Sequence, residues 1–191
     1  FYDKCFGIYE ISSENTEGTD CAYRYVGGFL NDQSEGFGSY QYYNCQNDDP
    51  SKYIGFFKNG KRSGLGYYDY VGFPDFFVGY YSNGRPLHGY YEGSNFYYFG
   101  EYDPNKSNYS GLGTWAYIND SEYKGHSFIG EFNDGLRNGQ GKYIFPDSTI
   151  EEGVYKDDKW VEEKKISNSV YDFYNIKKKY KFLKLEDLLV P

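Results

Sequence analysis

The chain has 191 residues and a formal net charge of −8, which suits one domain or one repeat array. It combines 26 tyrosines, 16 phenylalanines and 24 glycines with only 39% hydrophobic residues, so tyrosine and glycine carry most of the information that specifies order. The sequence lacks any run of 18 apolar residues that could span a bilayer, its aromatic content argues against disorder, and its acidity argues against general nucleic-acid binding. It begins at Phe1 and contains no methionine, which predicts a processed chain or a fragment.

Residues 1–24 are predicted to form a divergent N-terminal half-repeat that acts as a cap. They contain a weak copy, Cys5 to Tyr9, of the motif that dominates the next segment. The three cysteines, Cys5, Cys21 and Cys45, are too few for a disulfide framework. This fits a reducing compartment and leaves open one bridge between Cys5 and Cys21.

Residues 25–160 are predicted to form the repeat array. The repeated motif is an aromatic residue, any residue, glycine, any residue and a second aromatic residue, and a weaker copy lies at Glu151 to Tyr155. The five clear copies are Tyr25-Gly27-Phe29, Tyr53-Gly55-Phe57, Phe77-Gly79-Tyr81, Tyr98-Gly100-Tyr102 and Phe128-Gly130-Phe132.

A second half follows four of these copies and contains a Gly-x-Gly motif. These motifs are Gly36-Gly38, Gly64-Gly66, Gly111-Gly113 and Gly139-Gly141, whereas the third unit slips by one residue to Gly89. The turn dipeptides Asn59-Gly60, Asn83-Gly84 and Asp134-Gly135 lie between the halves and are strong hairpin signals. Each unit is therefore predicted to be a strand, a tight turn and a second strand.

Residues two apart in a strand share a face, so each glycine should lie between two aromatic side chains on one face of the sheet. Tyr53, Gly55 and Phe57 illustrate the pattern. A glycine at this place leaves a notch, and an aromatic ring from a neighbouring strand can lie across it.

The pattern from Phe128 to Gly141, and that from Tyr53 to Gly66, resembles the MORN repeat (membrane occupation and recognition nexus). The resemblance covers about residues 25–158, with departures in the third unit, where His88 and Gly89 are out of register, and in the units from Tyr25, Tyr98 and Tyr102. It implies an all-β fold, an elongated, twisted antiparallel sheet of six to seven successive hairpins and a length of roughly 60 Å. It also implies roles in cytoskeletal or ciliary assemblies, or as a structural subunit of another complex.

Residues 161–191 are predicted to form a linker and a basic amphipathic helix over 169–189, with Ser169 as its N-cap. Phe173, Ile176, Tyr180 and Leu183 recur at helical spacing. The residues predicted to contact a partner are a further apolar stripe and a lysine cluster. They are Phe182, Leu185, Leu189, Lys177, Lys178, Lys179, Lys181 and Lys184.

No motif for catalysis, a cofactor or a metal is predicted. The two histidines, His88 and His126, are interpreted as polar residues near turns that have no adjacent nucleophile. The run Asp103 to Ser107 lacks the glycine and the final acidic ligand of a calcium loop. The glycine-rich segment 135–142 should join two strands, which a phosphate loop does not.

The leading hypothesis is therefore a non-enzymatic scaffold that binds other proteins of a larger intracellular assembly, in the cytoplasm, the cytoskeleton or a cilium, or in an organelle if the N-terminus is processed. Self-association through the sheet ends is a further expectation. Membrane contact is expected only through the basic tail, and no nucleic acid is expected. One alternative is a targeting or regulatory module of a larger enzyme, and another is a lipid- or carbohydrate-binding repeat protein.

Overall fold

The computed structural model describes residues 5–11, 22–43, 51–70, 74–119 and 122–167. These residues form thirteen β-strands in one sheet, and each strand pairs antiparallel with the next strand in the sequence. The strands are β1 (Cys5–Ile11), β2 (Ala22–Leu30), β3 (Gln33–Tyr43), β4 (Ser51–Lys58), β5 (Lys61–Tyr70), β6 (Phe76–Ser82), β7 (Arg85–Glu92), β8 (Phe96–Tyr102), β9 (Tyr109–Tyr117), β10 (Ser127–Asn133), β11 (Leu136–Ile144), β12 (Ile150–Lys156) and β13 (Lys159–Glu163).

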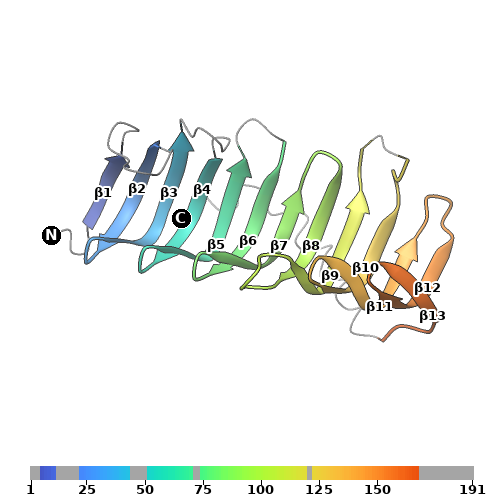
Figure 1. The fold of residues 1–191 in the computed structure, drawn as a ribbon. Helices are drawn as coiled ribbons and strands as arrows, with labels where there is room; N and C mark the ends of the chain where they lie inside the picture. The colour runs from blue at the N-terminus through green and yellow to red at the C-terminus, as the bar shows by residue number, and fades with distance from the viewer. Residues whose placement is uncertain (1–4, 12–21, 44–50, 71–73, 120–121, 168–191) are drawn as a thin grey trace.

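The sheet is elongated, with β1 at one end and β13 at the other (Figure 1). Twelve strand spacings of about 4.8 Å give a length of roughly 58 Å. The predicted fold, an extended antiparallel sheet of successive hairpins, is confirmed. The predicted helix over residues 169–189 lies outside the described residues.

Tight turns close the hairpins on one edge of the sheet. Asn59, Asn83 and Asp134 have φ angles of 49°, 55° and 53°, and each is followed by a glycine with positive φ, as a type I′ turn requires. The three predicted turn dipeptides are therefore confirmed. The sequence pattern did not identify two similar turns, Asn31-Asp32 and Asp157-Asp158, in which an aspartate takes the place of glycine.

One glycine from each of the first twelve strands lies in a continuous row across the sheet. The paired positions run in the order Gly7, Gly27, Gly38, Gly55, Gly66, Gly79, Gly89, Gly100, Gly113, Gly130, Gly141 and Gly153. We call this set the glycine row. Register shifts near it interrupt the pairing within six hairpins of the described part, and such bulges bend a strand.

Aromatic rings cover the glycine row on one face, which we call the inner face. In each clear copy of the motif, the first ring lies over two glycines. For example, a Cβ added at Gly113 would lie only 2.6 Å from Cε2 of Tyr98, and one added at Gly89 would lie 2.6 Å from Cζ of Phe77. The predicted notch is therefore present, and the ring that fills it comes from the same hairpin.

The first and second rings of the motif form an unbroken ladder along the inner face. Ten edge-to-face contacts join eleven rings, with centroid separations of 4.9–5.4 Å and interplanar angles of 74–90°. Aromatic pairs favour this geometry, because the positive edge of one ring meets the negative face of the next. The rings are, in order, Phe29, Tyr25, Phe57, Tyr53, Tyr81, Phe77, Tyr102, Tyr98, Phe132, Phe128 and Tyr155.

The third hairpin keeps the glycine row intact despite the slip in its sequence. Gly89 pairs with Gly79 on one side and with Gly100 on the other. In the β4–β5 hairpin, Gly55 pairs with Gly66 and Phe57 with Arg62, so an advance of two residues on β4 corresponds to four residues on β5. In the β6–β7 hairpin, the same advance from Gly79 to Tyr81 corresponds to only three residues on β7, so the bulge is one residue shorter.

Candidate functional site

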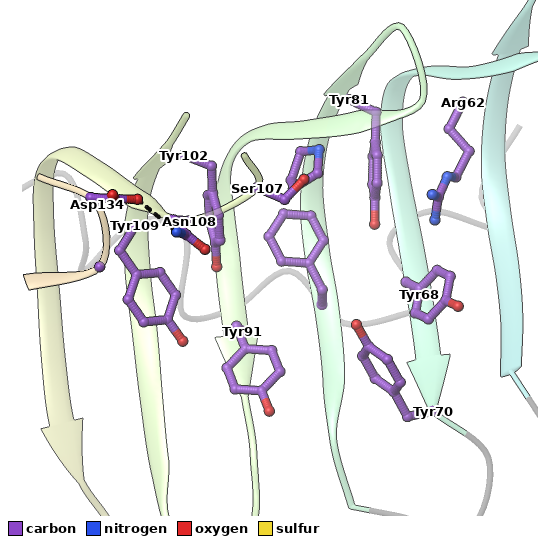
Figure 2. A pocket seen from close by; sticks show the side chains of 13 residues that line it. Arg62, Tyr68, Tyr70, Tyr81, Tyr91, Tyr102, Ser107, Asn108, Tyr109 and Asp134 are labelled. Carbon is purple, nitrogen blue, oxygen red and sulfur yellow. Dashed lines mark hydrogen bonds between the residues drawn. The ribbon is translucent and has the colours of Figure 1, made fainter. Parts of the chain in front are cut away.

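The inner face contains two adjoining cavities, with volumes of about 550 and 400 Å³, which both include Tyr109 and Gly135 in their linings. We call them together the aromatic groove. The larger cavity lies over β5 to β9 and the smaller over β9 to β11, where Asp158 of the β12–β13 turn also lines it (Figure 2 shows the larger). The lining residues of the larger cavity are Arg62, Tyr68, Tyr70, Phe77, Tyr81, Pro86, Tyr91, Tyr102, Ser107, Asn108, Tyr109, Asp134 and Gly135.

One repeat position differs in side-chain length between the hairpins. This position pairs with the second ring of the motif, and in two hairpins it is Arg62 or Arg137. It is Pro86 in the β6–β7 hairpin, Ser34 in the β2–β3 hairpin and Tyr109 in the β8–β9 hairpin. Pro86 lines the larger cavity, and because a proline ring is far shorter than an arginine side chain, it leaves more space there than an arginine would.

The two arginines each lie among three rings. The Arg62 guanidinium carbon is 5.7, 5.2 and 5.3 Å from the ring centroids of Tyr53, Tyr68 and Tyr81. Arg137 makes the same kind of contact with Phe128 and Tyr143 of its own hairpin and with Tyr155 of the next, at 5.1–5.7 Å. Cation–π attraction therefore holds a positive charge at each of these positions in the groove.

Polar contacts fix the walls of the larger cavity. The Tyr91 hydroxyl donates to Asp75 Oδ2 at 2.8 Å, and Asn108 Nδ2 donates to Asp134 Oδ1 at 2.8 Å, a bond drawn in Figure 2. The Asp134 carboxylate also forms an ion pair with the Lys106 ammonium group at 2.9 Å, and both of these side chains are exposed. The loop between β8 and β9 is thereby tied to the next hairpin turn and forms one wall.

Tyr102 is the one tyrosine of the cavity whose hydroxyl is buried without a hydrogen-bond partner among the described residues. In Figure 2 its ring extends into the cavity, as does that of Tyr81. Burial raises the pKa of Tyr102 well above its usual value, and the nearby Tyr109 adds to the effect. Burial also raises the pKa of Tyr109 to about 12. Both hydroxyls are therefore neutral at physiological pH.

The two histidines are placed differently by the structure. His88 was predicted near a turn, but this was wrong, because it lies within β7 on the outer face and stacks on Tyr80 with a centroid separation of 4.9 Å. His126 directly precedes β10, as expected, and its Nδ1 lies 2.9 Å from the Tyr143 hydroxyl. Within the described ranges, no three His, Cys, Asp or Glu side chains are grouped to hold a metal ion.

The other motifs that were weighed for chemistry have structural roles. Residues 103–107 form a turn in which Ser107 N donates to Asp103 O at 2.7 Å. Segment 135–142 enters β11 and opens no helix. Cys5 is a free thiol.

The predicted repeat-defining residues form the glycine row and the aromatic ladder, with one difference. The first glycine of each Gly-x-Gly motif, such as Gly64 with φ of 75°, lies in the bulge and takes a left-handed conformation. The residues predicted to contact a partner, from Lys177 to Leu189, lie outside the described residues. The groove arginines were missed, although both follow a turn glycine by two residues, at Gly60-x-Arg62 and Gly135-x-Arg137.

The fold and the groove define a tandem-hairpin repeat protein with an aromatic groove on its inner face. The MORN repeat model matches residues 25–44, 53–72 and 128–150, and the chain is a MORN-repeat protein. These matches cover the hairpins β2–β3, β4–β5 and β10–β11. MORN repeats indicate a repeat protein for interaction with proteins or membranes.

A search of curated proteins found no match. The described part of the chain contains no helix that is long and apolar enough to cross a membrane.

Proposed function

We propose that the protein is a non-catalytic scaffold, a subunit of a larger intracellular assembly, and that its aromatic groove binds an extended segment of a partner protein. The observation that carries this proposal is the groove itself, a concave surface lined by tyrosines over a rigid ladder of buried rings. Aromatic side chains are effective interface anchors because they bury a large area at a small cost in conformational entropy.

The dimensions of the groove favour an extended segment. Its two cavities span the sheet from β5 to β11, which is six strand spacings, or roughly 29 Å. An extended chain advances about 3.3 Å per residue, so the groove accommodates about nine residues. The two groove arginines, Arg62 and Arg137, supply polar contacts for backbone carbonyl groups of such a segment.

Cytoskeletal and ciliary assemblies are the settings we propose, because the body is a stiff rod suited to spacing other subunits. The tail residues Phe182, Leu185 and Leu189 are proposed as a second docking element. Alanine replacement of these three residues should lower incorporation into the assembly while the array stays folded. Unchanged incorporation would contradict the proposed tail contact but not the proposed binding by the groove.

The groove is tested by two matched substitutions in the tagged full-length chain, purified from its source cells with its partners. Tyr70→Glu places a charge in the larger cavity, and Phe37→Glu places the same charge on the outer face, where the parent side chain is equally exposed at 41%. A central interface position contributes 2 kcal/mol or more, so Tyr70→Glu should reduce partner recovery by about tenfold or more. The control should retain the partner.

Two outcomes would overturn the proposal. Equal recovery of the same partner by both variants excludes the groove as the binding surface. If the parent chain co-purifies with no protein in stoichiometric amount, the scaffold role itself fails.

A further inference from the structure

The aromatic groove contains one partly exposed aromatic ring per hairpin. Each of these rings packs against the buried aromatic cluster and also lines one of the two cavities. We call these four side chains the groove rings. They are Tyr68 of β5, Tyr91 of β7, Trp115 of β9 and Tyr143 of β11.

The groove rings are evenly spaced because they occupy one line of paired positions across the sheet. On this line they alternate with the first rings of the repeated motif, so that Tyr91 pairs with Phe77 on one side and with Tyr98 on the other. Trp115 likewise pairs with Tyr98 and with Phe128. Successive groove rings are therefore two strands apart, which is about 9.6 Å at about 4.8 Å per strand.

This spacing matches the repeat of one backbone conformation. A polyproline II helix has three residues per turn and rises about 3.1 Å per residue, so it presents the same side about every 9.3 Å. Over the three intervals from Tyr68 to Tyr143, three turns of such a helix advance about 28 Å and the groove rings about 29 Å.

The two other regular conformations do not keep one side toward successive groove rings. A β-strand covers about 9.6 Å in three residues, and because its side chains alternate, consecutive groove rings would meet opposite sides of it. An α-helix covers that distance in about 6.4 residues, or about 1.8 turns, so its facing side would rotate by about 80° at each step. Of these three conformations, only the polyproline II helix can contact every groove ring in the same way.

Hydrogen-bond donors beside the groove rings suit such a backbone. A polyproline II helix makes no internal hydrogen bonds, so its carbonyl oxygens accept hydrogen bonds from the surroundings. The hydroxyls of Tyr70 and Tyr109, which line the larger cavity (Figure 2), have no hydrogen-bond partner among the described residues. The Tyr68 hydroxyl instead donates to Ser51 Oγ at 2.8 Å, which fixes the orientation of that groove ring.

The two ends of the row of groove rings differ in charge. At one end the Arg62 guanidinium carbon lies 5.2 Å from the centroid of the Tyr68 ring, and within the described ranges this arginine has neither a carboxylate partner nor a hydrogen bond. At the other end Arg137 lies 5.1 Å from the centroid of the Tyr143 ring, but its charge is paired with Asp158 at 3.0 Å. The Arg62 end is therefore the one that attracts an acidic group of a ligand.

We propose that the segment bound in the aromatic groove is a polyproline II helix with proline at every third position, each proline stacked on one groove ring, and with a carboxylate beside Arg62. Proline suits such contacts because its ring is apolar and its fixed φ angle lowers the entropy lost on binding. The inference rests on the proposed function of the groove and specifies the class of its partner, an acidic proline-rich segment.

Two fluorescein-labelled peptides of equal composition test the repeat. The in-phase peptide, Asp-Pro-Pro-Ser-Pro-Pro-Ser-Pro-Pro-Ser-Pro, has one side of the helix with proline at four successive turns. The out-of-phase peptide, Asp-Pro-Pro-Ser-Pro-Ser-Pro-Ser-Pro-Pro-Pro, has the same residues but a serine on each of the three sides. Fluorescence anisotropy with the full-length chain should give a Kd about fivefold or more lower for the in-phase peptide, since the other peptide loses one stacking contact in every register.

Matched variants of the chain locate the contact. Tyr91→Leu removes one groove ring and should weaken binding of the in-phase peptide by about fivefold, whereas Phe37→Leu on the outer face should change the Kd by less than about twofold. Circular dichroism identifies a variant that has lost its fold, and in that event Tyr68→Leu replaces Tyr91→Leu. In a Trp160→Phe background Trp115 is the only tryptophan of the chain, so a change in its fluorescence on binding places the peptide in the groove.

The carboxylate contact is tested by a double-mutant cycle. Replacing the aspartate of the in-phase peptide with asparagine should weaken binding to the parent chain by about threefold and leave binding to the Arg62→Gln variant unchanged. An equal effect on both chains overturns the contact with Arg62.

Equal Kd values for the in-phase and out-of-phase peptides, or no binding of either peptide up to about 1 mM, overturns the polyproline assignment. If Tyr70→Glu still loses the native partner in that case, the groove remains the binding surface and only this inference fails. If Tyr70→Glu retains the native partner while the in-phase peptide binds more tightly, the proposed function of the groove fails instead.

Discussion

Replacing one glycine of the glycine row with alanine tests whether the aromatic ladder depends on the missing side chains. At Gly113 an added Cβ would lie 2.5 Å from the hydroxyl oxygen of Tyr98 and 2.6 Å from its Cε2, well inside van der Waals contact. Tyr98 is fully buried, at 0% exposed, and donates a hydrogen bond to Glu101 O at 2.8 Å. The ring must therefore move away from a place where it is enclosed on all sides.

The magnitude follows from what Tyr98 loses. Overpacking that the core can absorb costs about 1–3 kcal/mol. Complete expulsion of the ring would forfeit about 4–6 kcal/mol of apolar burial, at 25 cal/mol per Å² over 150–250 Å², and about 1 kcal/mol for the hydrogen bond. We expect Gly113→Ala to destabilise the protein by about 4 kcal/mol, which for a chain of 191 residues lowers Tm by roughly 8–16 °C.

Gly7→Ala is the matched control, because Gly7 belongs to the same row at its open end. There an added Cβ would approach only the edge of the Phe29 ring, at 3.3 Å, and that ring can shift by a few tenths of an ångström. Its cost should stay below about 1 kcal/mol. Urea unfolding followed by circular dichroism measures both variants.

A double-mutant cycle isolates the ring as the cause. In a Tyr98→Ala background the Gly113→Ala substitution should cost less than about 1 kcal/mol, since the clashing atoms are gone. If Gly113→Ala and Gly7→Ala destabilise the chain equally, or if the cost at Gly113 survives the loss of the ring, the glycines do not serve as notches for the ladder.

Three further predictions follow from single side chains. Burial raises the pKa of Tyr25, Tyr109 and Tyr155 from 10.0 to about 12. The free energy of unfolding should therefore be highest below pH 10 and fall by about 1–3 kcal/mol per tyrosine as the pH rises toward 12, because the unfolded chain then releases protons that the folded chain retains. A Tm that stayed constant from pH 8 to 12 would contradict this. Tyr102→Phe should stabilise the isolated protein by about 1 kcal/mol in urea unfolding, since it removes a buried hydroxyl without a partner, and a clear loss of stability would show that the hydroxyl is bonded. Arg137→Lys should destabilise by about 1–2 kcal/mol, because an ammonium group cannot both stack among three rings and make the paired hydrogen bonds to the next turn; Tm of the variant at the parent value would refute this.

The regular part of the fold was predictable because it depends on a pattern that repeats along the chain. A period-two alternation of rings about Gly55 or Gly130 predicts a strand face, and Asn59-Gly60 predicts the turn that closes a hairpin. Consecutive hairpins can only pair with their neighbours, so the pattern also predicts the sheet order. The notches themselves were anticipated from the same spacing.

The groove was not predictable, because it arises where the repeats differ. Its larger cavity is lined by Pro86 at a position that Arg62 and Arg137 occupy in other hairpins, and one sequence gives no measure of how far each side chain reaches across the sheet. His88 was misplaced for a related reason. The slip in the third unit looked like a turn, whereas a shorter bulge keeps that residue within a strand.

The glycine row has a mechanical consequence. A line of residues without side chains crosses the first twelve strands from Gly7 to Gly153, and aromatic rings packed over it repeat the same contact from one hairpin to the next. The length of the sheet therefore increases in equal increments of one hairpin, about 10 Å each. A gene that gained or lost one unit would change the span between attached partners by that step and leave the cross-section of the rod unaltered.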